Sequence, residues 1–299
     1  MLTLGGLAGL VAEHGDPSEL PVAPLRIGDT TYDVTDSPVV MGCVNLSRDS
    51  TYRDSIAVSV GSAVRRARVM AAEGAVVIDI GAESSTAAAA RVGADEQVAA
   101  LVPVVEALVA EDVAVSVETY EPQVAAQTLR AGARMLNLTG TQHQDEMLDL
   151  VAEHDATVVL CYGGGANVRE ITDVRLDGDP VPELVDHFAA RLEHARARGV
   201  ERIVIDPGMG FYYGNLTDPM TRARHQARVL LSGFRLRALG VPVCNALPHA
   251  FDLFEEQFRG GEAFFAVWAV LGGTSLLRTH EVARVRPVVA AMRELVAAS

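Results

Sequence analysis

The chain has 299 residues, of which 49% are hydrophobic and 21% are charged, so it is long and apolar enough to bury a large core. The formal net charge of −14 argues against a surface that binds nucleic acid, and no apolar run reaches the length that spans a membrane. All 25 basic residues are arginine, which excludes Schiff-base chemistry, internal pyridoxal phosphate linkage and any phosphate-binding loop that depends on lysine.

The first 38 residues predict an N-terminal arm followed by a hairpin. Residues 1–19 are mildly apolar, but they lack a basic start and contain Glu13 and Asp16. We therefore interpret them as an arm or a short helix and not as a signal peptide. Residues 24–38 predict a β-hairpin with Gly28 and Asp29 at its tip.

The cysteines indicate a reducing compartment. Cys43, Cys161 and Cys244 are scattered, odd in number and placed in apolar runs. This pattern predicts reduced thiols in the core of a cytoplasmic protein, where disulfides are rare.

Eight short apolar runs, rich in Val, Ile and Leu, predict β-strands that are buried on both faces. They cover residues 39–45, 75–81, 113–119, 134–140, 157–162, 202–208, 241–246 and 275–282. Apolar residues at helical spacing predict helices in seven further segments: 62–75, 95–112, 121–133, 182–199, 218–240, 255–273 and 286–299.

This alternation predicts an α/β fold, a (β/α)₈ TIM barrel with an N-terminal arm and β-hairpin. The barrel would occupy residues 39–299, and the arm and hairpin of residues 1–38 would precede it, with the hairpin over the barrel floor. We see no linker or internal repeat, so we expect a single domain. The alternative is a doubly wound open sheet, but no Gly-rich dinucleotide fingerprint follows the first strand.

Polar residues stand at the carboxyl end of nearly every predicted strand, where a TIM barrel places its active site. They are Asn45, Asp79 with Glu83, Glu118 with Thr119, Asn137 with Thr139, Asp206, Asn245, and Arg278 with His280. Glu118, Asn137 and Asp206 could converge on one edge of a flat, nitrogen-rich ring, because carboxylates accept from ring N–H groups and an amide both donates and accepts. Arg278 could stack on that ring or bind an anion. The eight histidines show no metal-ligand spacing.

Six segments resemble, in order, the motifs of the dihydropteroate synthases. They read "VVMGCVNLSRDS", "GAVVIDIGAESS", "VSVETY", "MLNLTG", "IDPGMGF" and "LLRTHEV". The resemblance runs from about residue 39 to residue 290. It identifies the chain as a member of the pterin-binding barrel superfamily, which also holds methyltetrahydrofolate methyltransferases.

The resemblance implies a role for each matching residue. Glu118, Asn137 and Asp206 would hold the pterin, Arg278 and His280 would help to bind pyrophosphate, and Asp206, Arg278 and His280 would form the catalytic set. Asn45 would lie on the phosphate side and could bind Mg²⁺. We expect a pterin or folate as substrate, no tightly bound cofactor, no membrane or nucleic-acid partner, and a homodimer packed through the last helices.

The departures from the family pattern concern the anion and amine side. The segment "VPVCNALPHAF" has Pro248, His249 and Ala250 where the family has Ser-Arg-Lys, and Thr86 replaces the second-loop Arg. "GFYYGN" and "CYGGGAN" also depart from the family, and Glu118 stands where the family has Asp. Arg91 or His249 could partly compensate for the lost charges.

We therefore expect a dihydropteroate synthase-like pterin-binding transferase that is not an efficient folate-pathway synthase. The alternatives are a methyltetrahydrofolate-dependent methyltransferase and a non-catalytic pterin-binding or scaffold protein.

Overall fold

The computed structural model describes residues 3–15, 20–47, 57, 59–84, 89–163, 165–170, 172–211 and 213–296. Eight parallel strands form one sheet in the order β8-β7-β6-β5-β4-β3-β10-β9. Their bounds are β3 Val39–Asn45, β4 Val77–Gly81, β5 Val115–Thr119, β6 Met135–Leu138, β7 Thr157–Cys161, β8 Ile203–Asp206, β9 Cys244–Ala246 and β10 Leu276–Thr279. An isolated parallel bridge between Ile205 and Val243 joins the two ends of the sheet, and the Ile205 N–H donates to the Pro242 carbonyl at 3.0 Å. The predicted TIM barrel is confirmed.

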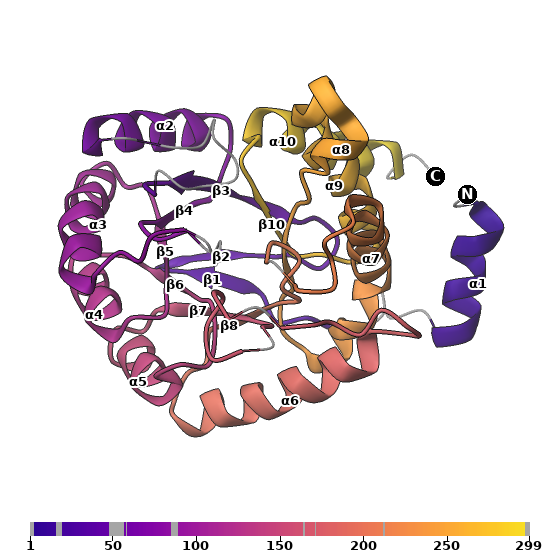
Figure 1. The fold of residues 1–299 in the computed structure, drawn as a ribbon, viewed down its shortest axis with the longest axis horizontal. Helices are drawn as coiled ribbons and strands as arrows, with labels where there is room; N and C mark the ends of the chain where they lie inside the picture. Colours follow the sequence, from indigo (N-terminus) through magenta and orange to yellow (C-terminus); the bar gives the residue numbers. More distant parts are fainter. Residues whose placement is uncertain are drawn as a thin grey trace.

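Helices surround the barrel on its outside (Figure 1). They are α2 Val60–Ala72, α3 Ala94–Val109, α4 Pro122–Arg130, α5 Gln144–Glu153, α6 Val181–Ala197, α7 Pro219–Ser232, α9 Gly261–Leu271 and α10 Val282–Val296. A large cluster of buried apolar side chains fills the layer between strands and helices, as the continuous apolar strands require. In α7, the Asp218 carboxylate accepts from the Thr221 N–H at 2.7 Å and Pro219 occupies the first turn, which together start the helix at that point.

Four segments differ from the sequence prediction. Helix α5 was not predicted, because it is short and follows His143, whose backbone is left-handed. The predicted helix 218–240 breaks after Ser232 into the 3₁₀ helix η3 Gly233–Leu239. The predicted helix 255–273 is divided into η4 Glu255–Gly260 and α9, and the unpredicted short helix α8 Phe251–Phe254 precedes it. The last strand ends at Thr279 and not at 282, so His280 lies at the mouth of the barrel, directly after the strand.

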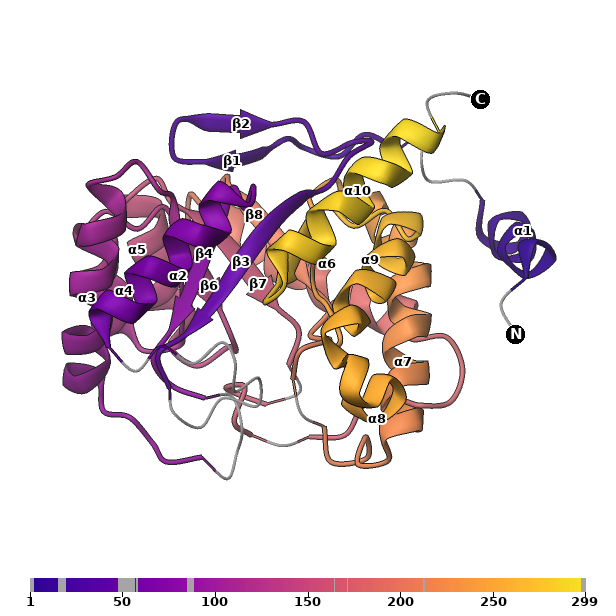
Figure 2. The same ribbon diagram turned by 90° about the horizontal axis from the view of Figure 1, so that it is seen from above.

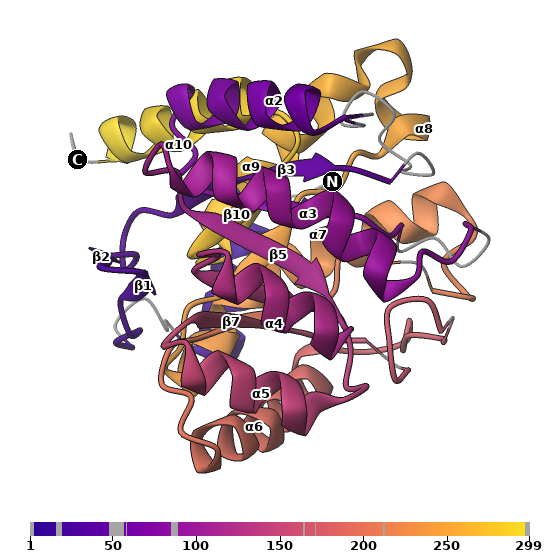
Figure 3. The ribbon, with the colours of Figure 1, turned by 90° about the vertical axis from the view of Figure 1, so that its left-hand side faces the viewer.

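The predicted hairpin closes the floor of the barrel. It consists of β1 Leu25–Ile27 and β2 Thr30–Tyr32, which pair antiparallel around Gly28 and Asp29. Its buried side chains Leu25 and Ile27 pack with strand residues such as Met41 in a second apolar cluster. Figures 2 and 3 show the hairpin across one end of the barrel, opposite the loops that follow the strands. Because the floor is closed, a ligand can enter only from those loops.

The N-terminal helix α1, Leu4–His14, stands apart from the barrel (Figures 1 and 2). The Thr3 hydroxyl accepts from the Gly6 N–H at 3.1 Å and caps it, and the helix buries none of its residues. This confirms the short helix predicted within the arm. Within the described residues, no helix combines the length and apolar character needed to cross a membrane.

Candidate functional site

A cavity of about 190 Å³ opens at the carboxyl ends of the barrel strands. All six residues to which the resemblance gave a role lie on its wall: Asn45, Glu118, Asn137, Asp206, Arg278 and His280. The structure therefore brings together side chains that are up to 235 positions apart in the chain, because they stand at the carboxyl ends of five strands of one barrel. Five of the six belong to two groups of side chains, which also include Asp79, His249 and Glu262.

The first group, which we call the strand cluster, consists of five residues from five strands: Asp79, Glu118, Asn137, Asp206 and Arg278. Arg278 Nε donates to Asp79 Oδ2 at 2.7 Å, and its Nη2 donates to Glu118 Oε2. Asp79 is 0% exposed and also accepts from Asn137 Nδ2 at 3.0 Å. The guanidinium is thus fixed between two carboxylates, in the charge-paired state that a buried acid requires.

Two further contacts complete the environment of Asp79 and Asn137. The Ser116 hydroxyl donates to Asp79 Oδ1 at 2.6 Å, and the Cys161 thiol donates to Asn137 Oδ1 at 3.1 Å. All three cysteines are buried and free, as expected from the sequence. Cys161 lines the cavity itself. These contacts hold Asn137 in one orientation.

Asp206 ends β8 and turns its carboxylate to the cavity. Burial raises its pKa to about 6, although the Gly208 N–H donates to Oδ1 at 2.8 Å and Arg278 favours the charged form. Gly208 is required in this turn, because its φ is 78° and a Cβ there would lie 2.3 Å from the Tyr162 carbonyl oxygen. Burial also raises the pKa of Glu118, against the effect of Arg278.

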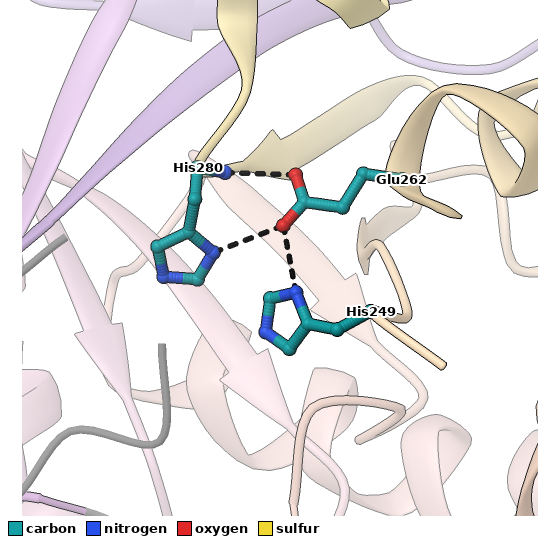
Figure 4. Close-up of side chains that lie close together, drawn as sticks. All are labelled: His249, Glu262 and His280. Carbon is teal, nitrogen blue, oxygen red and sulfur yellow. Dashed lines mark hydrogen bonds and ion pairs between the residues drawn. The ribbon is translucent and has the colours of Figure 1, made fainter. Parts of the chain in front are cut away.

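The second group, which we call the histidine cluster, consists of His249, Glu262 and His280. Glu262 Oε1 lies 2.9 Å from His249 Nδ1 and 3.1 Å from His280 Nδ1. Glu262 Oε2 accepts from the His280 backbone N–H at 2.9 Å and from the Thr279 hydroxyl. Figure 4 shows both imidazole rings with Nδ1 turned toward the same carboxylate oxygen. His249 follows β9, His280 follows β10, and Glu262 is in the first turn of α9.

Burial and hydrogen bonding act in opposite directions on Glu262 and His280. Burial by itself would raise the pKa of Glu262, which is 1% exposed, but the hydrogen bonds from His249 and His280 outweigh it and hold the pKa well below its usual range. Burial lowers the pKa of His280 to about 4, although Glu262 favours the charged ring. The cluster therefore carries an ionised carboxylate at neutral pH.

The described surroundings of Asn45 do not form a Mg²⁺ site. Asn45 Nδ2 faces His280 Nε2 at 3.3 Å, and the Cys43 thiol lies 3.9 Å from Asn45 Oδ1. Mg²⁺ requires near-octahedral oxygen ligands, and Asn45 supplies a single amide oxygen here. Residues 48–56 of the same loop lie outside the described residues, so Mg²⁺ binding at Asn45 stays a prediction.

The structure adds Asp79 and Glu262 to the residues that the sequence placed in the site. Asp79 was noted as a strand-end residue, but its buried partners could not be seen from the sequence. Glu262 was missed, and the available signal was one acid inside the apolar stretch "GEAFFAVWAVL". The absence of metal-ligand spacing among the histidines did not reveal that two of them meet an acid in the folded chain. Spacing is measured along the chain, whereas His249, Glu262 and His280 come together from a loop, a helix and a strand end.

The expected compensating residues have different surroundings. His249 is part of the histidine cluster and lines the cavity. Arg91 donates to the Tyr120 hydroxyl at 3.3 Å, beside the second loop. Thr86 and Tyr212 lie outside the described residues.

Comparisons with known proteins agree with the motifs. Residues 41–280 match the sequence family described as pterin binding enzyme. The chain is 30% identical over 273 residues to the dihydropteroate synthase of Synechocystis sp., and the match covers 87% of this chain and 90% of the relative. It is 30% identical to a solved dihydropteroate synthase of Xanthomonas albilineans in complex with indole-2-carboxylic acid and 6-chloroguanine, with a TM-score of 0.75 and coverage of 93% of this chain and 100% of that one. A structure from the same organism in complex with 7,8-dihydropteroate is 28% identical, with a TM-score of 0.71 and coverage of 91% and 98%.

Proposed function

The chain belongs to the family of pterin binding enzymes, and we propose that it is a dihydropteroate synthase-like transferase that binds a pterin ring at the strand cluster. The observation that carries the proposal is the convergence of Glu118, Asn137 and Asp206 on the wall of one cavity. Each comes from a strand, so the barrel fixes its position. Rigid polar groups of this kind recognise the edge of a flat heterocycle.

The strand cluster offers mainly acceptors, which suits a pterin. The Asp206 carboxylate can accept from a ring N–H and from the exocyclic amino group. The second amide hydrogen of Asn137 and the carboxylate of Glu118 supply further polar contacts beside it. Arg278 is held by Asp79 and Glu118, so its guanidinium plane is available as a fixed platform for the ring or for an anion.

In the proposed reaction an arylamine nitrogen attacks the methylene carbon of a pterin that carries pyrophosphate there. A C–N bond forms, the C–O bond to pyrophosphate breaks, pyrophosphate leaves with the electron pair, and the amine releases one proton to solvent. The Asp206 carboxylate favours the positive charge that develops on the pterin methylene. In this proposal, Arg278 and His280 stabilise the negative charge that develops on the leaving group. The bound 7,8-dihydropteroate of the solved relative is the type of product that this reaction yields.

We further propose that this chain is a slow folate-pathway synthase when Mg²⁺ is its only divalent ion. The lysine and the second-loop arginine of the family motifs are absent from the sequence. Removing one preorganised charge-stabilising donor costs about 10²–10³ in kcat in well-studied enzymes. The loss of two such donors is expected to cost at least that factor.

Calorimetry with oxidised and dihydro forms of 6-hydroxymethylpterin tests the binding step. Asp206→Asn and Asn137→Ala should each weaken binding by about 1–3 kcal/mol, because each leaves polar groups of the complex unpaired. Asp149→Asn, on the exposed face of α5, is the matched control and should bind like the wild type. Absence of pterin binding, or unchanged affinity in both site variants, would overturn the proposal.

A turnover assay tests the reaction. Chelator-treated protein is supplied with Mg²⁺, the pterin pyrophosphate and 4-aminobenzoate, beside the Synechocystis relative. We expect detectable product at a rate at least about 10²-fold below that of the relative. An equal rate would contradict the slow-synthase proposal, and pterin binding with no product under any metal condition would favour a non-catalytic protein. The relatives named above are dihydropteroate synthases, so the methyltransferase alternative is not favoured.

We also propose that the protein is a homodimer that packs through its last helices. Phe264 and Leu271 on α9 are 43% and 49% exposed, which leaves apolar surface on that side of the barrel. Sedimentation velocity of the wild type and of Phe264→Glu tests this, because a charge in that surface should shift a dimer toward monomer. A monomeric wild type would contradict it.

A further inference from the structure

We propose that His249, Glu262 and His280 bind a divalent first-row transition-metal ion, within the series Mn²⁺ to Zn²⁺, at the edge of the substrate cavity. Two imidazoles and one carboxylate are a donor set that these ions accept, whereas Mg²⁺ requires oxygen ligands. One possible ligand atom from each of the three side chains lies within 4.8 Å of the other two. His249 and His280 both line the cavity.

The separations fit ligands of one ion. Two donors that each lie about 2.1 Å from a metal are about 3.0 Å apart when they subtend a right angle at it. Glu262 Oε1 lies 2.9 Å and 3.1 Å from the two Nδ1 atoms. Each imidazole nitrogen and the carboxylate oxygen therefore have the separation of neighbouring coordination positions, and the remaining positions are left for water or substrate oxygens.

The ligands are held in the way that metal ligands are usually held. The second oxygen of Glu262 accepts from the Thr279 hydroxyl and from the His280 N–H, so the carboxylate cannot rotate freely. Glu262 and His280 are mounted on a helix and on the end of a barrel strand, which fixes their separation. Supporting hydrogen bonds of this kind orient a ligand.

Asn45 can support the metal-bound form of His280. In the metal-free molecule, His280 Nδ1–H donates to Glu262 and Nε2 accepts from Asn45 Nδ2, 3.3 Å away. Coordination through Nδ1 moves the proton to Nε2, and rotation of the amide then places Asn45 Oδ1 to accept it. A coordinating histidine whose other nitrogen donates to an oxygen is the usual arrangement.

The charge of the cavity gives the ion a role. Of the described residues on its wall, four are acidic (Glu83, Glu118, Asp206 and Asp252) and two are basic (Arg222 and Arg278). Arg278 is already paired with Asp79 and Glu118. A pyrophosphate group in this cavity therefore meets more acidic than basic side chains, and a divalent ion on the histidine cluster would supply further positive charge. This role rests on the proposed function, whereas the metal site itself does not.

The test is a titration of chelator-treated, untagged full-length protein with Co²⁺, followed by its visible ligand-field absorption. We expect saturable binding of one ion per chain, with Zn²⁺ displacing it. Glu262→Gln and His249→Ala should each weaken Co²⁺ binding by more than the about 10–100-fold loss that removal of a supporting group causes. His154→Ala, at the end of α5, is the matched control and should titrate like the wild type.

The outcomes are separable. The absence of saturable Co²⁺ binding, or wild-type titration of both ligand variants, overturns the metal site. Circular dichroism shows whether Glu262→Gln folds. If it does not, His249→Ala alone tests the metal site, because His249 is only half-buried. Pterin calorimetry on the same metal-free protein then separates the two proposals. Pterin binding without Co²⁺ binding overturns only the metal site, and Co²⁺ binding without pterin binding overturns only the proposed function.

Discussion

The strand cluster and the histidine cluster both place basic groups around buried carboxylates, but they are built on different elements. Every member of the strand cluster is a barrel strand residue, whereas the histidine cluster combines a loop, a helix and the residue after a strand. The motifs that resemble the dihydropteroate synthases include all of the strand cluster. His249 lies in a segment that departs from those motifs, and its side chain contacts Glu262. In the proposed function, the strand cluster supplies the family's ring recognition, and the departure at His249 changes the chemistry at the other end of the cavity.

The two clusters also differ in the charge that they leave unbalanced. In the strand cluster, one guanidinium is paired with two carboxylates, while the third, Asp206, makes no ion pair with it in the described part of the chain, which favours a ligand rich in N–H donors. In the histidine cluster, the ionised Glu262 faces two imidazoles, a combination that favours a cation. Variants that act on one cluster and leave the other unchanged test this difference.

The largest effect is expected from Arg278→Ala, which removes the only cation of the strand cluster. Asp79 and Glu118 would stay buried without a charge partner, and breaking such a pair costs about 3–5 kcal/mol. The measurement is the free energy of unfolding from a denaturant titration. Arg68→Ala removes a solvent-exposed pair with Glu111 and should leave the transition midpoint almost unchanged. A loss in Arg278→Ala no larger than that of the control would show that the buried acids do not depend on Arg278.

The second prediction concerns Asp206→Asn, which is expected to increase the free energy of unfolding, whereas Arg278→Ala decreases it. The pKa of Asp206 is raised to about 6, so the folded protein binds this proton more tightly than the unfolded chain. Stability therefore falls as pH rises from about 4 to about 6, and above that range the full cost of the buried charge is present. Asp206→Asn should raise the free energy of unfolding at pH 7.5 by about 1–3 kcal/mol and change it little at pH 4.

Asp149→Asn on the surface of α5 is the control for this measurement and should show no such pH-dependent gain. An Asp206→Asn variant that is equally destabilised at both pH values would show that the Asp206 carboxylate is well solvated in the folded protein. The expected gain in stability accompanies a loss of pterin affinity, so the residue would be kept for binding at a cost to the fold.

The strand cluster lies on barrel strands and the histidine cluster mostly does not, and this difference explains what could be predicted from the sequence. The apolar runs predict the eight strands and therefore the strand ends, so Asp206 and Arg278 could be placed in the site before the structure was known. The hairpin over the floor followed from Gly28 and Asp29 between two short β-patterns. The pairing of Arg278 with Asp79 depends on side-chain direction across the barrel, which strand order does not determine.

Glu262 could not be predicted for a related reason. It precedes β10 on a helix that packs outside the barrel, and no strand-end pattern marks it. Its partner His249 follows the predicted seventh strand, and the short elements α8 and η4 stand between it and α9, where η4 replaces the start of the predicted helix. Irregular segments of this kind leave no periodic signal, so only the three-dimensional packing reveals which side chains meet.

The third prediction concerns the hydroxyl that holds Glu262. Thr279→Val keeps the shape of a buried side chain but removes its hydrogen bond to Glu262 Oε2. Loss of a supporting group of this type weakens metal binding by about 10–100-fold, so Co²⁺ affinity should fall by that factor while pterin affinity stays unchanged. Thr128→Val is a matched control, because this buried hydroxyl donates only within α4. A parallel loss of pterin affinity would show that the two clusters are not independent.

The smallest effect is the pH dependence of pterin binding by the metal-free protein. Because the pKa of Asp206 is about 6, its carboxylate is present at pH 7.5 and is progressively protonated below pH 6. A protonated Asp206 loses acceptor capacity toward the ring N–H groups, so affinity should be flat above about pH 7 and fall by about tenfold at one pH unit below the pKa. Calorimetry from pH 5 to pH 8 measures this profile, and Asp206→Asn should bind weakly with a much flatter profile.

Burial raises the pKa of Glu118 as well, so Glu118→Gln is the second variant. If the pH profile of pterin affinity becomes flat in Glu118→Gln but not in Asp206→Asn, then Glu118 on β5 is the group that titrates. Glu118, in place of Asp206, would then bind the N–H groups of the pterin.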